Sequence, residues 1–159
     1  MSRGYQYTTA VPTLSEGQTV RERCDVNGRV LTASGENANT AALITLTSAG
    51  VGTTNGSDQT NTANRGVLVG VNITALTGTA PTVTVTIQGK DAASGVYYTL
   101  LASAAIVSTG FTLLTIYPGA TAATNTVADK SLPMTWRVIA AVAGTSPAAT
   151  ATVGACVVI

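Results

Sequence analysis

Few side chains in this sequence could act as a nucleophile or a general base. No histidine is present, and histidine is the residue that most often accepts a proton at neutral pH. Cys24 and Cys156 therefore lack the basic partner that would turn either thiol into a thiolate nucleophile. The two cysteines are far apart and form no Cys-x-x-Cys pair, so the sequence predicts no metal site. A disulfide of Cys24 or Cys156, within one subunit or between subunits, stays open.

Carboxylates are the remaining candidates for catalysis, because a pair of them can hydrolyse a glycosidic bond. Asp58, Asp91 and Asp129 each fall in a segment expected to turn, where an aspartate normally accepts hydrogen bonds from its own backbone. Asp25 begins an Asp-Val-Asn-Gly sequence similar to the start of a calcium loop, but the later carboxylates of such a loop are missing. Neither Gly-x-Ser-x-Gly nor a phosphate-binding P-loop occurs. The sequence therefore predicts a protein that is not an enzyme and holds no cofactor.

The composition indicates a surface that is hydrated without charge. Only 9% of the residues are charged, against about a quarter in an ordinary soluble domain, and the formal net charge is +1. Thr, Ser, Asn and Gly must supply the polar surface, which gives little electrostatic repulsion between copies. The basic residues are too few and too scattered for a nucleic-acid footprint. We therefore expect the chain to associate with protein subunits and not with nucleic acid.

The sequence contains no segment expected to cross or enter a membrane. No run of about 18 apolar residues is present. The first nine residues lack the apolar stretch of a secretory signal. We expect the chain to be made in a cytoplasm, and to stay there or join a structure assembled there.

Aromatic side chains could form a platform for a sugar. Tyr97 and Tyr98 are neighbours in an expected strand, so they point to opposite faces and at most one of them can belong to such a platform. Trp136 fits a core position better, because it is in phase with apolar residues of its own expected strand, namely Met134, Val138 and Val142. Carbohydrate binding stays an alternative.

Strand signals dominate the rest of the chain. Residues 82–88 alternate strictly, which places Val83, Val85 and Ile87 on one face and threonines on the other. Similar runs occupy residues 43–47, 67–76, 96–102, 111–117, 134–142 and 149–159. About seven strands predict an all-β fold, an antiparallel β-sandwich over residues 41–159. The runs 67–73 and 156–159 are apolar on both faces, so either loops or a neighbouring subunit must cover the second face.

One segment is repeated within the chain. Residues 73–87 resemble residues 139–153, which places Gly78-Thr-Ala-Pro81 and Gly144-Thr-Ser-Pro147 at equivalent positions. Glycine permits the positive φ of a tight reversal, and proline ends the turn because it lacks an N–H. The repeat predicts two hairpins of one design, the alternative being a chance likeness of two Thr- and Ala-rich strands.

Two connections and the first forty residues depart from this strand pattern. Residues 50–66 and 118–133 are long for connections, and we expect them at one end of the sandwich, reaching a partner, with room for one helical turn in the second. Residues 1–40 hold more than half of all charged residues, and Asn27-Gly28 is typical of a two-residue hairpin turn. They predict an extended N-terminal arm containing a hairpin, folded on the sandwich or laid on a neighbour.

Several segments resemble structural proteins of tailed-bacteriophage virions. The first is Pro12-Thr-Leu-Ser-Glu-Gly-Gln-Thr-Val20, followed by Cys24-Asp-Val-Asn-Gly-Arg-Val-Leu31. The others are residues 83–103, Ile116-Tyr-Pro-Gly119 and Leu132-Pro-Met-Thr-Trp-Arg-Val138. The likeness covers most of the chain from about residue 12 and is closest to capsid decoration, or cement, proteins. Its motifs are structural rather than catalytic.

The resemblance implies a function and a set of partners. A decoration protein of this kind binds the major capsid protein on the outer surface of the head and stabilises the capsid, commonly as a homotrimer whose arms cross capsomer boundaries. Residues of the arm that would contact the shell are Arg21, Arg23, Asp25, Asn27 and Arg29. A locally ion-paired, solvated hairpin is the alternative for these residues. A tail, neck or fibre component with a receptor- or glycan-binding role is the alternative for the whole chain.

Overall fold

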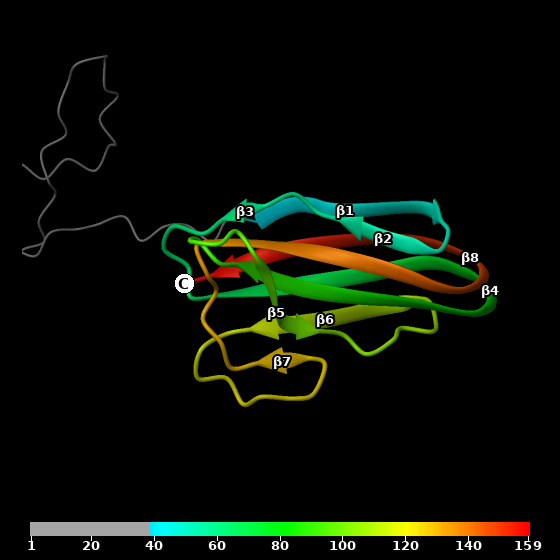
Figure 1. The fold of residues 1–159 in the computed structure, drawn as a ribbon. Coiled ribbons are helices and arrows are strands. Elements are labelled where there is room, and N and C mark those ends of the chain that lie inside the picture. Colours follow the sequence, from blue (N-terminus) through cyan, green and yellow to red (C-terminus); the bar gives the residue numbers. More distant parts are fainter. Residues whose placement is uncertain (1–38) are drawn as a thin grey trace, which may run out of the picture. The chain divides into compact units, whose positions relative to one another are not determined.

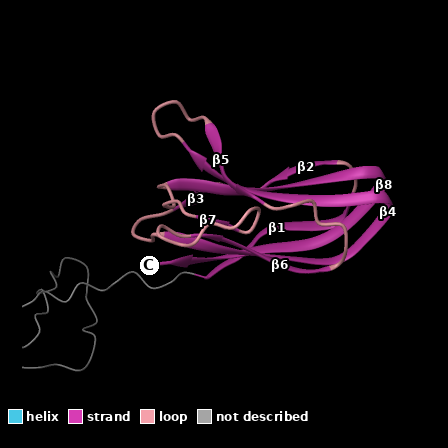
Figure 2. Cartoon of the chain, turned by 90° about the horizontal axis from the view of Figure 1, so that it is seen from below, coloured by secondary structure: helices cyan, strands magenta, loops and turns pink. Residues whose placement is uncertain are grey.

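The structure is a computed structural model that describes residues 39–159. Its strands are β1 (Asn39–Ala49), β2 (Gly52–Asn55), β3 (Gln59–Thr60), β4 (Gly66–Lys90), β5 (Tyr97–Ala102), β6 (Gly110–Ile116), β7 (Val127–Ala128) and β8 (Thr135–Val158). Figure 2 shows that the regular structure of this range consists of strands. The all-β prediction is confirmed. The predicted N-terminal arm lies outside the described residues.

β4 and β8 organise the sheet. They have 25 and 24 residues and pair antiparallel along almost their whole length, from Gly66 opposite Val158 to Gly89 opposite Trp136. The strand order is β1-β8-β4-β6-β7, with β2 and β3 also paired to β8 and β5 paired to β4. The short β6–β7 pair is parallel, whereas the other pairs are antiparallel. The described strands therefore form one continuous hydrogen-bonded sheet.

The paired β4–β8 ribbon folds back on itself at its middle (Figure 1). Each strand has a glycine of positive φ at the bend and a second positive-φ residue two positions later: Gly78 (117°) with Ala80 (48°), and Gly144 (128°) with Ser146 (47°). The pairing continues through the bend, where Thr79 lies opposite Thr145. The repeat seen in the sequence is thus a repeated bend, in which two copies of one backbone design lie side by side.

The bends correct the prediction of two hairpins. The chain reverses where the glycines and prolines predict it, but residues 66–77 and 82–90 of β4 each pair with β8 instead of with one another. Each bend also packs on the other, since a Cβ at Gly144 would lie 2.8 Å from the Ala80 carbonyl oxygen. Local sequence determines that the chain reverses, whereas long-range pairing determines which strands share hydrogen bonds.

The fold-over produces two layers. The first layer contains β1, residues 145–158 of β8, residues 66–77 of β4, β6 and β7; the second contains β2, β3, residues 135–143 of β8, residues 82–90 of β4 and β5 (Figure 1). The core includes Val67, Val69 and Val71 of the first layer and Val83 and Val85 of the second, all fully buried. Burying each such side chain stabilises the fold by about 1.5–3 kcal/mol. The two layers belong to one folded sheet, joined through the β4–β8 bend. The prediction differed in connectivity, because it had strands paired through hairpins.

The two long connections follow the sheet edges, which corrects the expectation that they gather at one end. Residues 50–66 contain β2 and β3, both paired with β8, and residues 118–133 contain β7 beside β6. The second connection has no helix but does contain a hydrogen-bonded turn, in which the Ala123 carbonyl oxygen accepts from the backbone N–H groups of Thr126 and Val127. β2 is exposed at all four residues, so backbone pairing rather than burial holds it in place. Apolar patterning could not reveal such a strand.

Candidate interaction surface

The outward surface of the first layer has no charged side chain over its middle; Arg65 lies at its end, with its guanidinium 5.4 Å from the centre of the Tyr117 ring. We call it the uncharged face and define it by outward residues of four neighbouring strands: Ala42 of β1; Thr152, Gly154 and Cys156 of β8; Leu68, Gly70 and Asn72 of β4; and Phe111 and Leu113 of β6. Strand alternation produces it, because Val67, Val69 and Val71 face the core and leave Leu68, Gly70 and Asn72 outward. The charged residues of the described range lie in connections or on the second layer: Asp58, Arg65, Lys90, Asp91, Asp129, Lys130 and Arg137.

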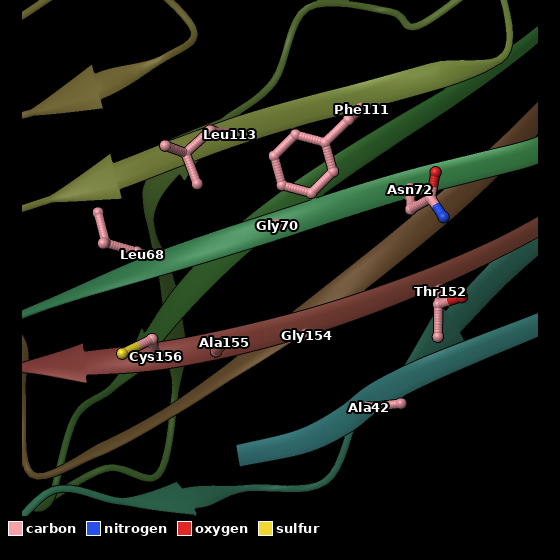
Figure 3. Close-up of a pocket in the computed structure, with 10 residues that line it drawn as sticks. All are labelled: Ala42, Leu68, Gly70, Asn72, Phe111, Leu113, Thr152, Gly154, Ala155 and Cys156. Carbon is pink, nitrogen blue, oxygen red and sulfur yellow. The ribbon is translucent and has the colours of Figure 1, made fainter. Parts of the chain in front are cut away.

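A shallow groove of about 490 Å³ runs over the middle of this face (Figure 3). Its floor is the directly paired glycines Gly70 and Gly154, on adjacent strands β4 and β8. Because neither has a side chain, the sheet surface is hollow between the residues that flank the pair. Phe111 and Leu113 rise on the β6 side, and Cys156 lies on the β8 side.

Phe111 explains one of these two glycines. A Cβ at Gly70 would lie 2.9 Å from Cζ of Phe111, so the absence of a side chain lets the phenyl ring lean over β4. The ring is nevertheless 68% exposed, and Leu113 beside it is 47% exposed. An exposed phenylalanine next to a second exposed apolar residue, on a face without charge, is typical of an interaction site.

Gly154 has no such explanation within residues 39–159. A Cβ built there meets no atom within 4 Å, and the backbone does not need positive φ. Glycine in the middle of a strand is less favourable than alanine by about 0.5–1 kcal/mol, and it often marks a place where another group approaches closely. The open half of the groove is therefore a candidate site for a side chain from outside the described part of the chain.

The uncharged face bears on the two alternatives for the outward side of the run 67–73, which were cover by loops or by a neighbouring subunit. The described connections do not cover its outward residues: Leu68 and Gly70 line the groove and Asn72 is exposed. The sequence signal for Phe111 and Leu113 was also present, because residues 111–117 carry apolar side chains on both faces. Nothing in the sequence distinguishes Gly154 from the other glycines, since its role depends on its partner Gly70 across the sheet.

The outward surface of the second layer contrasts with this face, because its polar groups bind one another. Tyr97 Oη donates to Asp58 Oδ1 at 2.7 Å, and Lys90 Nζ donates to Asp58 Oδ2 at 2.9 Å. Arg137 places its guanidinium 3.5 Å from the centre of the Tyr97 ring and donates from Nε to Gln88 Oε1 at 2.9 Å. These five residues, the polar cluster, join the β2–β3 connection to β4, β5 and β8.

The polar cluster favours the ionised form of Asp58. The hydrogen bond from Tyr97, followed by that from Lys90, lowers the pKa of the Asp58 carboxyl below its ordinary 3.8. The hydrogen bond with Asp58 in turn raises the pKa of Lys90 above 10.5. Each of the five side chains of the polar cluster thus has a partner within the protein.

The turn aspartates follow the prediction in one case out of three. Asp91 accepts hydrogen bonds from the hydroxyl and the backbone N–H of Ser94, and the first of these, followed by the second, lowers the pKa of its carboxyl. For Asp58 the local prediction is wrong, because its partners are the distant Lys90 and Tyr97. Asp129 instead accepts from the backbone N–H of Gly119, ten residues earlier, and so closes the 118–133 connection.

The aromatic predictions are correct for the strand residues. Trp136, Val138 and Val142 are buried, but Met134 precedes β8 and is 72% exposed, so its predicted core position is wrong. Tyr97 points to the polar cluster and presents one face of its ring to Arg137. Tyr98 points the other way: a Cβ at Gly89 would lie 2.6 Å from Cζ of Tyr98 and 2.9 Å from Cγ of Pro133, so the Tyr98 ring lies over Gly89 beside Pro133. Tyr98 is 45% exposed.

The predicted shell-contacting residues, Arg21, Arg23, Asp25, Asn27 and Arg29, lie outside the described residues. So does Cys24, and the disulfide question therefore stays open; the Cys156 thiol is half-buried at the groove. Over residues 39–159 there is no group of three or more Cys, Asp or Glu side chains that could hold a metal ion, nor any helix long and apolar enough to cross a membrane. No known family model, curated protein or solved structure matches this chain.

Proposed function

We propose that this chain is a structural protein of a bacteriophage virion that decorates the outer surface of the head and stabilises the capsid by binding the major capsid protein. The resemblance of residues 12–31, 83–103 and 132–138 to decoration proteins suggests the kind of particle. The observation that carries the proposal is the uncharged face, with its exposed Phe111 and Leu113. A face of this kind is suited to being covered by protein.

The physical reason is the low cost of covering such a face. Burying a charged side chain requires removing its hydration shell, and no residue of the uncharged face imposes that cost. Covering Phe111 and Leu113 releases water from apolar surface at about 25 cal/mol per Å². A subunit repeated many times over a shell can use such modest contacts, because neighbouring contacts add through avidity.

The charged arm is the proposed contact with the shell. Acidic residues alternate with Arg21, Arg23 and Arg29 within ten positions. Arginine forms bidentate hydrogen bonds with carboxylates, so these side chains could pair with acidic groups of the shell. Asp25 and Asn27 would fix the turn that presents them. In this proposal the arm binds the major capsid protein. Residues 39–159 form the body, which the arm attaches to the capsid surface.

Capsids of the parent phage assembled without this chain provide the test. The full chain is expected to co-sediment with them, whereas a chain lacking residues 1–35 keeps β1 to β8 and loses most of this binding. Charge reversal at Arg21, Arg23 and Arg29 together should weaken binding at least about tenfold, and Arg65→Glu with Lys130→Glu is the control in the body. Circular dichroism checks that each variant is folded. Full decoration by the truncated chain would contradict the proposal.

A tail, neck or fibre component that binds a glycan is the second candidate, and one observation favours it. Tyr98 and Met134 expose apolar surface near Pro133, away from the uncharged face. Tyr97 is a poorer platform, because Arg137 already lies over its ring. A glycan array with the wild type and Tyr98→Ala separates the candidates: a sugar that binds the wild type and loses binding in the variant would support the second.

A further inference from the structure

The uncharged face carries both a projecting group and a hollow that could receive it. Phe111 lies opposite Asn72 on one side of β4, and Gly154 lies opposite Gly70 on the other side. Two strand spacings and a two-residue offset place their Cα atoms roughly 12 Å apart. The projection is 68% exposed, and no atom of residues 39–159 lies within 4 Å of the position of the missing Cβ at Gly154.

We propose that the uncharged face is the interface of a two-fold symmetric homodimer, in which Phe111 of each copy lies in the groove over Gly154 of the other. A two-fold axis in the plane of the interface, passing over β4 at the midpoint of the line from Phe111 to Gly154 and perpendicular to that line, exchanges their positions. A projection and a hollow on one face then meet twice in a single self-complementary contact. The inference goes beyond the proposed function. Self-association through this face does not depend on whether the arm binds a capsid protein.

A second copy fits this face better than a charged protein surface does. A partner with lysines or glutamates opposite the groove would have to bury them without a counter-charge, since the uncharged face offers none. The same face of a second copy brings no charge. The low net charge of +1 also leaves little repulsion between copies.

The geometry also limits the strength of the contact. Four strands about 4.8 Å apart and seven residues of about 3.3 Å give a face of roughly 19 by 23 Å, at the small end of protein interfaces. The Phe111 rings of the two copies would lie near one another above the glycine pair and could stack with an offset. We therefore expect reversible dimers with a dissociation constant on the order of 10–100 µM. This differs from the trimer that the resemblance to decoration proteins implies.

Sedimentation equilibrium of the full chain, from about 1 to about 300 µM, is the first test. The wild type should pass from the 15.9-kDa monomer to twice that mass. Phe111→Ser removes the projection and Gly154→Gln fills the hollow with an uncharged side chain, and each should weaken the dimer at least about tenfold. Val107→Ser is the matched control, because Val107 is also 68% exposed but lies in the β5–β6 connection.

A charge exchange at Asn72 tests the symmetry. Asn72 is exposed and lies beside the proposed axis, so the two copies of this residue face each other. Asn72→Arg and Asn72→Asp should each be monomeric because like charges meet. An equimolar mixture of the two variants should form dimers again.

Three outcomes would overturn the inference: a wild type that stays monomeric over this range, a trimer, or a dimer that Phe111→Ser and Gly154→Gln leave unchanged. The first would leave the shell protein or the N-terminal arm as the occupant of the groove. Circular dichroism of each variant separates loss of association from loss of fold. Capsid co-sedimentation of the same variants is measured independently, so failure of the dimer and failure of the proposed function are distinguishable.

Discussion

The two outward faces of the folded sheet share the strands β4 and β8. They differ in whether their side chains have partners within the protein. On the second layer, Asp58 accepts hydrogen bonds from Lys90 and Tyr97, and the Tyr97 ring makes cation–π contacts with Lys90 and Arg137. On the first layer, Phe111 remains exposed beside a groove that no described residue fills. A face whose groups already have partners contributes to stability, whereas a face with open apolar surface is available for binding. In our proposals, the second layer therefore contributes to stability and the uncharged face of the first layer to association.

The largest effect is expected at the bend that gives the sheet two faces. Gly144→Val places a Cβ 2.8 Å from the Ala80 carbonyl oxygen at a φ of 128° and should destabilise the body by about 3 kcal/mol or more. Denaturant unfolding followed by fluorescence of Trp136, the only tryptophan, measures the change. Gly110→Val is the control, because Gly110 has a φ of 138° but meets no atom within 4 Å. Equal losses in the two variants would argue against packing between the bends.

A pair of glycine variants sharpens the contrast on the uncharged face. Gly154→Ala should stabilise the monomer by about 0.5–1 kcal/mol, because alanine loses less conformational entropy in a strand and meets no neighbour. Gly70→Ala should not, because its Cβ would push against the Phe111 ring at 2.9 Å. Thermal unfolding at a dilution that keeps both variants monomeric gives the comparison. A destabilising Gly154→Ala would mean that the floor of the groove is already occupied.

The smallest effect is expected from the polar cluster, which is exposed to solvent. The pKa of Asp58 is lowered in the folded state, so its contribution to stability is present above the ordinary value of 3.8 and is lost as pH falls through the folded value. Stability of the wild type should therefore decline below about pH 4, and Asp58→Asn should decline less steeply. Asp91, whose pKa is also lowered, keeps some decline in the variant. Thermal unfolding between about pH 2 and 7 checks this.

Asp58→Asn also tests the division of roles between the faces. The polar cluster lies on the opposite surface from Phe111, so this variant should leave the dissociation constant of the dimer unchanged. A shift in self-association comparable to that of Phe111→Ser would show that the two faces are not independent.

Local sequence predicted the strands well but not their partners. The alternation of Val83, Val85 and Ile87 with threonines identified a core-facing strand, and the Gly and Pro residues at 78–81 and 144–147 located the reversals. Hairpins were the wrong interpretation, because the pairing of β4 with β8 joins residues about 50 to 90 positions apart. Asp58 was assigned to its own turn for the same reason, since Lys90 and Tyr97 approach it only in the folded sheet.

The candidate site was visible in the sequence only in part. Runs that are apolar on both faces pointed to a second covered surface, and Leu68 and Phe111 indeed line one groove. The hollow could not be foreseen, because it arises from the pairing of Gly70 with Gly154 across two strands. The arm residues from Arg21 to Arg29 stay a prediction, since they lie outside the described residues.

Imaging of the particle that carries this chain tests the central claim most directly. Electron cryo-microscopy should show the body of residues 39–159 on the outer surface of the head, with the uncharged face against a neighbouring protein. A head-surface location with Phe111 covered is the predicted result. A body located on the tail, or one on the head whose Phe111 face points to solvent, would contradict the account.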